Sequence, residues 1–120
     1  VNPNRPLSTA SVFGALQESD MAPKSQAHPE YVGDPESYLD ILSGRRNDLT
    51  RPACDLCPEI GDILAALLDL NDCRLARMSG SGPTCFGIFS SPQSCAHAAE
   101  LISDSHPGWW VYPTYTRARL

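Results

Sequence analysis

Residues 76–89 read ARMSGSGPTCFGIF, and two short strand-like pieces in this stretch flank a loop of glycine and serine. Residues 74–79 and 84–89 have strand patterns, and the loop between them is tight enough for an antiparallel pair. Gly80 and Gly82 permit a positive φ and the close approach of a ligand or a second backbone. Successive free N–H groups in such a loop can form an anion-binding concavity. A plain hairpin turn accounts for the same residues, because glycine-rich turns between strands are common.

Helical patterns surround this hairpin. Apolar residues recur at three- and four-residue steps in four stretches. These stretches are residues 8–16, residues 35–42, residues 50–70 and the segment that opens at Ser91-Pro92. Pro58 is expected to bend the longest helix, because its ring removes one internal hydrogen bond, and Thr50 is its expected N-cap. Ser8 or Thr9 is the expected N-cap of the first helix, and Asp34 that of the second.

Strand patterns at the two ends complete the fold. Residues 1–6 predict the end of a strand whose upstream part is missing, and residues 109–116 predict a last strand that Pro113 weakens. With the short stretch at residues 35–42 left out, the order is then partial strand, helix, helix, strand, strand, helix, strand. Helices packed on one face of a small antiparallel sheet can bury a single hydrophobic core between the two layers. The sequence therefore predicts a single α+β domain over residues 1–120, with a ferredoxin-like topology and helices packed on one face.

The composition excludes several classes of protein. The net charge is −5 and the cationic residues are scattered, so no nucleic-acid partner is expected. No apolar run approaches the roughly 18 residues of a membrane span, and no signal-peptide pattern is present. We therefore expect no membrane partner and a cytoplasmic location. The chain starts at Val1 as an internal cut would, which predicts a fragment of a longer protein.

The cysteines do not predict a metal or redox site. Five cysteines are an odd number, which disfavours a complete disulfide framework. Cys54 and Cys57 have the spacing of half a zinc site, but Cys73 and Cys85 are too far apart in the sequence to supply the second half. Cys54 and Cys57 also lie in a helical pattern, where cysteine behaves as a small apolar residue. No metal ligand is therefore assigned.

The glycine-rich stretch and several other segments match one known family. The matching segments are VNP at residues 1–3, LSTA at 7–10, NDLT at 47–50, RMSGSGPTCF at 77–86 and GWW at 108–110. Together they resemble the carboxy-terminal domain of the GHMP small-molecule kinases over nearly the whole chain, and least over residues 18–38. Within this superfamily, the chain is most similar to the kinases that act on a cytidine-diphosphate substrate of the non-mevalonate isoprenoid pathway. A homoserine or mevalonate kinase is the alternative within the superfamily.

The resemblance implies that the glycine bend lines the cleft for the acceptor substrate. It is then expected to lie beside the loop that binds the nucleotide phosphates, at the junction of two kinase domains. The residues of this phosphate-proximal bend are Ser79, Gly80, Ser81, Gly82 and Thr84. The backbone N–H groups of Gly80, Ser81 and Gly82 are expected to face a phosphate or a developing negative charge. The alternative is that the bend only packs against the other domain.

The resemblance also implies a substrate-binding wall on the first helix. Thr9 and Phe13 lie four residues apart and therefore share one helical face. Phe13 is expected to stack on the cytosine ring, while Thr9 supplies a hydroxyl group. The alternatives are a core anchor for Phe13 and a helix cap for Thr9.

Most of the phosphoryl-transfer machinery is expected to lie outside residues 1–120. The resemblance implies an ATP-dependent kinase that uses Mg²⁺, with both bound mainly by an amino-terminal domain, which is the expected partner of this chain. Lys24 is the only lysine, and no glycine-rich phosphate loop surrounds it. No catalytic residue is therefore assigned here, and the chain alone is expected to be inactive.

Two further interpretations remain open in the sequence. Asn47-Asp48 is interpreted as a turn in which the side chains accept hydrogen bonds from backbone donors. A ferredoxin-like scaffold does not fix a function, so a stand-alone ligand-binding or regulatory module is the alternative to a kinase domain.

Overall fold

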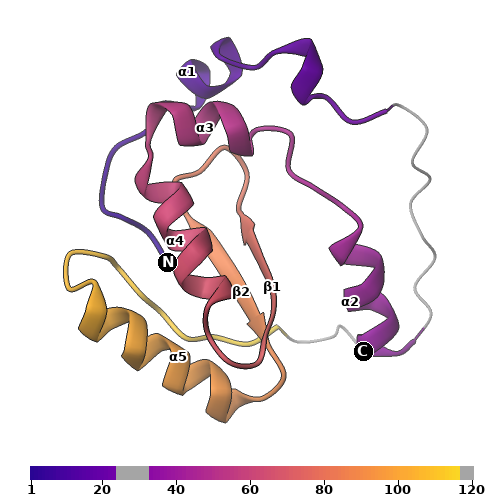
Figure 1. Ribbon diagram of the computed structural model, residues 1–120, viewed down its shortest axis with the longest axis vertical. Helices are drawn as coiled ribbons and strands as arrows, with labels where there is room; N and C mark the ends of the chain where they lie inside the picture. The colour runs from indigo at the N-terminus through magenta and orange to yellow at the C-terminus, as the bar shows by residue number, and fades with distance from the viewer. Residues whose placement is uncertain (24–32, 117–120) are drawn as a thin grey trace.

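A computed structural model of the chain describes residues 1–23 and 33–116, so Lys24 lies outside the described residues. At its centre is the predicted hairpin, in which β1 (Cys73–Met78) pairs antiparallel with β2 (Cys85–Phe89). The other elements are α1 (Thr9–Gly14), the 3₁₀ turn η1 (Glu18–Asp20), α2 (Pro35–Ser43), α3 (Thr50–Leu56), α4 (Glu59–Leu68) and α5 (Pro92–Ser105). In Figure 1, the bend that joins β1 to β2 lies at the end of the hairpin next to α3 and α1.

The amino-terminal residues lie beside β2 and extend the hairpin. Val1 and Cys85 exchange backbone hydrogen bonds of 2.8 and 2.9 Å, and Asn2 exchanges two bonds of 2.8 Å with Trp110. Reciprocal bonds of this kind mark antiparallel neighbours. The order is therefore β1, β2, the Val1-Asn2 segment and the Trp110 segment, which is the strand order of a ferredoxin-like fold. Only β1 and β2 form strands among the described residues.

The last predicted strand is wrong in its extent. Of residues 109–116, only Trp110 makes a strand-like pairing. On one side of this pair, Asn4 turns out of the sheet with a φ of +57°, and its N–H donates to Asn2 Oδ1 at 2.8 Å. On the other side, residues 112–116 have no strand partner within the described chain.

The core lies between the hairpin and helices α4 and α5 (Figure 1). α4 packs across both β1 and β2, and α5 contacts α4 and β2. Buried side chains from these elements, α1 and the α3–α4 segment form one cluster: Val12, Ala53, Cys57, Ile60, Ile63, Leu67, Met78, Cys85 and Ile102. α2 lies beside β1 and contributes no buried residue. This arrangement confirms the predicted α+β class with a small antiparallel sheet.

The predicted helix over residues 50–70 is two helices. α3 ends at Leu56, Cys57 leaves the helical region with a φ of −140°, and Pro58 is the N-cap of α4. Proline cannot donate the backbone hydrogen bond that would carry one helix into the next, so the expected bend becomes a break. Thr50 is not the cap either, because the N-cap of α3 is Leu49, without a side-chain cap bond.

Three helix starts confirm the sequence prediction. Side-chain oxygens of Ser8, Asp34 and Ser91 cap α1, α2 and α5, each accepting a hydrogen bond from a backbone N–H in the first turn. Such caps satisfy donors that have no partner inside the helix. No helix in the described part of the chain combines the length and the apolar character that a membrane span needs.

Candidate substrate-binding site

The bend between β1 and β2 adopts a backbone that its glycines allow. Gly80 has a φ of +56° and Gly82 a φ of +77°, values that residues with a side chain rarely adopt. The bend is closed by hydrogen bonds from Ser79 N–H to the Thr84 carbonyl at 2.8 Å and from Gly82 N–H to the Ser79 carbonyl at 3.0 Å. The Gly82 N–H therefore already donates within the bend, and its role toward a phosphate stays a prediction. In the described part of the chain, the N–H groups of Gly80 and Ser81 have no hydrogen-bond partner and remain available to an anion.

Helix α1 lies against this bend. Thr9 Oγ1 is 2.9 Å from Ser81 Oγ, which is a hydrogen bond between residues 72 positions apart. The cap of α1 is the hydroxyl of Ser8, which accepts from Ser11 N–H at 3.2 Å, so Thr9 is not the cap. The structure thus brings together the two segments to which the resemblance assigns ligand contacts, while their roles toward a ligand remain predictions.

Phe13 is an exposed side chain and does not anchor the core. It keeps 55% of its surface exposed, whereas its neighbour Val12 is fully buried in the core cluster. Phe13 follows Thr9 by about one helical turn, and both are exposed, so they share the outer face of α1. An aromatic ring is therefore available for stacking one turn from the contact between α1 and the bend.

The two ends of the bend differ in their surroundings. Thr84 is half-buried, and its hydroxyl oxygen accepts a hydrogen bond from Asn2 Nδ2 at 2.9 Å. Its own proton can still be donated, because a hydroxyl group both donates and accepts. Ser79 is exposed at the other end. Thr84 is therefore tied to the amino-terminal segment, and Ser79 faces solvent.

Asn47 holds the start of the bend. Its Nδ2 donates to the carbonyls of Met78 at 3.0 Å and Gly80 at 2.8 Å, and its Oδ1 accepts from Leu49 N–H at 3.0 Å. The last bond confirms the predicted turn. The first two are long-range bonds that the sequence does not predict, since an asparagine before a helix indicates only a local turn.

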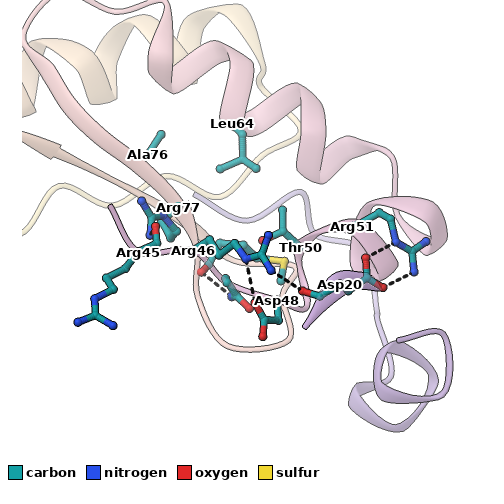
Figure 2. Close-up of a pocket in the computed structure, with 11 residues that line it drawn as sticks. Asp20, Arg45, Arg46, Asp48, Thr50, Arg51, Leu64, Ala76 and Arg77 are labelled. Carbon is teal, nitrogen blue, oxygen red and sulfur yellow. Dashed lines mark hydrogen bonds and ion pairs between the residues drawn. The ribbon is translucent and has the colours of Figure 1, made fainter. Parts of the chain in front are cut away.

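A hollow of about 460 Å³ opens next to Asn47, at the start of α3 (Figure 2). At one side of it, Arg51 Nε and Nη2 donate to the two carboxylate oxygens of Asp20 at 2.5 and 2.6 Å. Arg51 Nη2 also donates to the Ala15 carbonyl at 3.0 Å, and Nη1 pairs with Asp55. The Asp20 side chain is only 7% exposed. Arg51 therefore binds the segment that follows α1 to the first turns of α3.

A second ion pair in the hollow supports the same segment. Asp48 Oδ2 accepts from Ala22 N–H at 2.9 Å, and Asp48 Oδ1, which is buried, lies 3.3 Å from Arg46 Nε. Arg46 also donates to the Asp20 carbonyl at 3.3 Å. Both guanidinium groups thus face carboxylates of the protein. We interpret these two ion pairs as a charged anchor for residues 15–22.

The Arg51–Asp20 pair predicts a pH dependence of folding. Hydrogen bonds from Arg51 and from the Gln17 backbone lower the pKa of Asp20 from its ordinary 3.8 to about 2. A lowered carboxyl pKa gives stability that is present above pH 3.8 and is lost as the pH falls toward 2. Asp20→Asn should therefore be less stable than the parent protein at pH 6, by a margin that shrinks between about pH 4 and 2. Urea titrations at several pH values test this, and a margin that stays constant down to pH 2 contradicts it.

The cysteines that have half a zinc motif lie in the core. Cys57 belongs to the buried cluster and Cys54 packs against it, which confirms that they behave as small apolar residues. Burial is the main cause that raises the pKa of both thiols. Within residues 1–23 and 33–116, no group of three or more His, Cys, Asp or Glu side chains is placed to hold a metal ion.

Comparison with known proteins identifies the family. Residues 33–103, more than half of the chain, match the family model described as GHMP kinases C terminal. The 4-diphosphocytidyl-2-C-methyl-D-erythritol kinase of Methylobacterium radiotolerans is 44% identical over 120 residues, which cover 98% of this chain and 41% of that protein. The protein of the same name from Paracoccus denitrificans is 46% identical over 111 residues, covering 92% and 40%. The chain thus spans about two fifths of the length of these relatives.

A solved structure supports the same assignment. The crystal structure of a 4-(cytidine 5'-diphospho)-2C-methyl-D-erythritol kinase superposes with a TM-score of 0.64 at 26% identity, over 86% of this chain and 37% of that chain. The family model runs from before α2 into α5, so it includes the hairpin and the bend. The chain belongs to the GHMP kinases, as a carboxy-terminal domain of that family.

Proposed function

We propose that the chain is the acceptor-side part of an ATP-dependent kinase that phosphorylates a hydroxyl group of 4-(cytidine 5'-diphospho)-2-C-methyl-D-erythritol. The reaction is a step of isoprenoid-precursor synthesis by the non-mevalonate pathway. The relatives that support this substrate carry it in their names, and they are about two and a half times as long as this chain. An amino-terminal domain of the full-length protein completes the site, and residues 1–120 alone are inactive.

The observation that carries this proposal is the contact between α1 and the glycine bend. Thr9 and Ser81 meet at 2.9 Å, so the exposed aromatic residue Phe13 lies one helical turn from the point where α1 contacts the bend. Two N–H groups of the bend have no hydrogen-bond partner among residues 1–23 and 33–116. An aromatic ring recognises a nucleobase by stacking, and backbone N–H groups recognise phosphate oxygens. A nucleoside diphosphate has both groups, at its two ends. The exposed face of α1 and the glycine bend are therefore together suited to bind a cytidine-diphosphate substrate.

In this proposal, the chain contributes positioning and not covalent chemistry. Phosphoryl transfer depends mainly on alignment of the reactants and on neutralisation of the developing charge. The N–H groups of Gly80 and Ser81 are suited to face a phosphate oxygen, and Phe13 with Thr9 to hold the cytidine end. Ser79, Gly82 and Thr84 form the frame of the bend. The acceptor hydroxyl is thereby fixed relative to the bound nucleotide.

We assign ATP and Mg²⁺ mainly to the amino-terminal domain. When bound, Mg²⁺ neutralises charge on the transferred phosphate. The proposal places the enzyme in the cytoplasm, with a small-molecule substrate, its own amino-terminal domain as partner, and neither nucleic acid nor membrane as a partner. Residues 1–120 are the carboxy-terminal domain in this arrangement.

The test is a kinase assay on the full-length protein that contains this chain. With ATP and Mg²⁺ present, ADP release should depend on 4-(cytidine 5'-diphospho)-2-C-methyl-D-erythritol. Homoserine and mevalonate are the matched controls, since they are acceptors of other kinases in the superfamily. ADP release with either control, and none with the cytidine substrate, contradicts the proposal.

A further inference from the structure

We infer that Asn47 and Arg51 are positioning residues that hold the two walls of the candidate site from one corner of the fold. The corner is the turn into α3, residues 47–51. One wall is the glycine bend, residues 79–84, to which Asn47 donates a hydrogen bond. The other wall is α1, and Arg51 donates a hydrogen bond to its C-cap residue. The inference rests on the proposed function, because it assigns a kinetic role to each wall.

Asn47 fixes the bend from this corner. Both N–H donors of its carboxamide are used, one on the Met78 carbonyl before the bend and one on the Gly80 carbonyl inside it. The carboxamide is itself held, because Oδ1 accepts from Leu49 N–H at 3.0 Å and the Asn47 carbonyl accepts from Thr50 N–H at 3.1 Å. The position of the bend is therefore set by the start of α3.

Arg51 fixes the other wall. Its bond to the Ala15 carbonyl holds the C-cap residue of α1, two positions after Phe13. Its two bonds to Asp20 hold the turn that follows, and Asp48 holds Ala22 further along. The guanidinium makes these bonds in a planar fork that a lysine cannot reproduce. The position of α1 is therefore set by the same corner.

The two walls also contact each other directly. Thr9 and Ser81 touch where α1 meets the bend, and α1 also packs against α3. A change at Asn47 acts first on the bend, whereas a change at Arg51 acts first on α1. Since the bend is proposed to face the phosphates and α1 the base, the two changes should have different kinetic effects.

The kinetic test uses the full-length protein. Asn47→Asp keeps the size of the side chain but removes both donors, so kcat should fall about tenfold or more, with a smaller change in KM for the cytidine substrate. Arg51→Lys keeps the charge but removes the fork, so KM for the cytidine substrate should rise about fivefold or more, with KM for ATP unchanged. Asn71→Asp and Arg74→Lys make the same changes at the far end of the hairpin and should alter neither constant. The absence of this split, in variants that are fully folded by thermal unfolding, overturns the inference.

A second measurement does not depend on activity. In hydrogen exchange of the full-length protein, Asn47→Asp should speed exchange of the hydrogen-bonded Ser79 and Gly82 amides about tenfold, while the hydrogen-bonded amides of residues 9–22 stay protected. Arg51→Lys should do the reverse. Exchange that is unchanged, or that rises equally in both segments, overturns the inference even if the kinase assay is negative. A negative assay of the parent protein with the expected exchange pattern overturns the proposed function only.

Discussion

Gly82→Ala is expected to destabilise the protein by about 2–5 kcal/mol and to remove most of its kinase activity. The φ of +77° at Gly82 costs a residue with a Cβ about 1–2 kcal/mol. The new Cβ also lies 2.8 Å from Met78 Sδ and 3.2 Å from Ile60 Cδ1, and both side chains are fully buried. Overpacking of this kind adds roughly 1–3 kcal/mol, because both side chains belong to the packed core and must shift to make room for the Cβ. Urea titration of the full-length protein measures the loss.

Gly80→Ala is the matched control for this prediction. Gly80 has a similar backbone, with a φ of +56°, but a Cβ there meets no atom within 4 Å. Only the backbone strain of about 1–2 kcal/mol should appear. Equal losses of stability in the two variants contradict the packing of Gly82 against Met78 and Ile60.

Phe13→Ala is expected to raise KM for the cytidine substrate by about 5- to 150-fold, which corresponds to the roughly 1–3 kcal/mol of base stacking. Because Phe13 is 55% exposed, removal of its ring should leave the free energy of unfolding nearly unchanged. KM for ATP should also stay the same, since the ATP site is assigned to the other domain. Steady-state kinetics with each substrate varied in turn measure both constants.

Val12→Ala is the control for Phe13, one position away on α1. Val12 is fully buried, so its truncation should cost about 1–3 kcal/mol of stability and leave KM for the cytidine substrate unchanged under conditions where the variant is folded. An equal rise of both Michaelis constants in Phe13→Ala removes Phe13 from the base-binding wall.

Features that depend on local sequence were predictable here. The caps Ser8 and Asp34 are short polar residues before apolar-periodic runs, and their hydrogen bonds reach only two or three residues along the chain. The hairpin follows from two strand patterns and the glycines of the bend. Such signals need no knowledge of the rest of the fold, which is why they agree with the structure.

Features that depend on partners far away in the sequence could not be predicted. Residues 109–116 have a strand pattern, but a strand forms only where a neighbouring segment supplies hydrogen bonds, and in the described chain Asn2 does so for Trp110 alone. The break at Cys57-Pro58 separates apolar residues whose spacing continues across it, so periodicity alone favoured one helix.

In the candidate site, too, the contacts between residues far apart in the sequence could not be predicted from local patterns. The meeting of Thr9 and Ser81 was expected only through the resemblance to the kinase family, because no local pattern relates residues 72 positions apart. Asn47 and Arg51 were missed as links between the walls. Their partners, Gly80 and Asp20, are 33 and 31 residues away, and a single sequence contains no signal for such pairs.

The most direct test of the account is a crystal structure of the full-length protein with 4-(cytidine 5'-diphospho)-2-C-methyl-D-erythritol bound. We expect the cytosine ring to stack on Phe13, and a substrate or nucleotide phosphate oxygen to lie within hydrogen-bond distance of the N–H of Gly80 or Ser81. A substrate bound in contact with neither Phe13 nor the bend would contradict it.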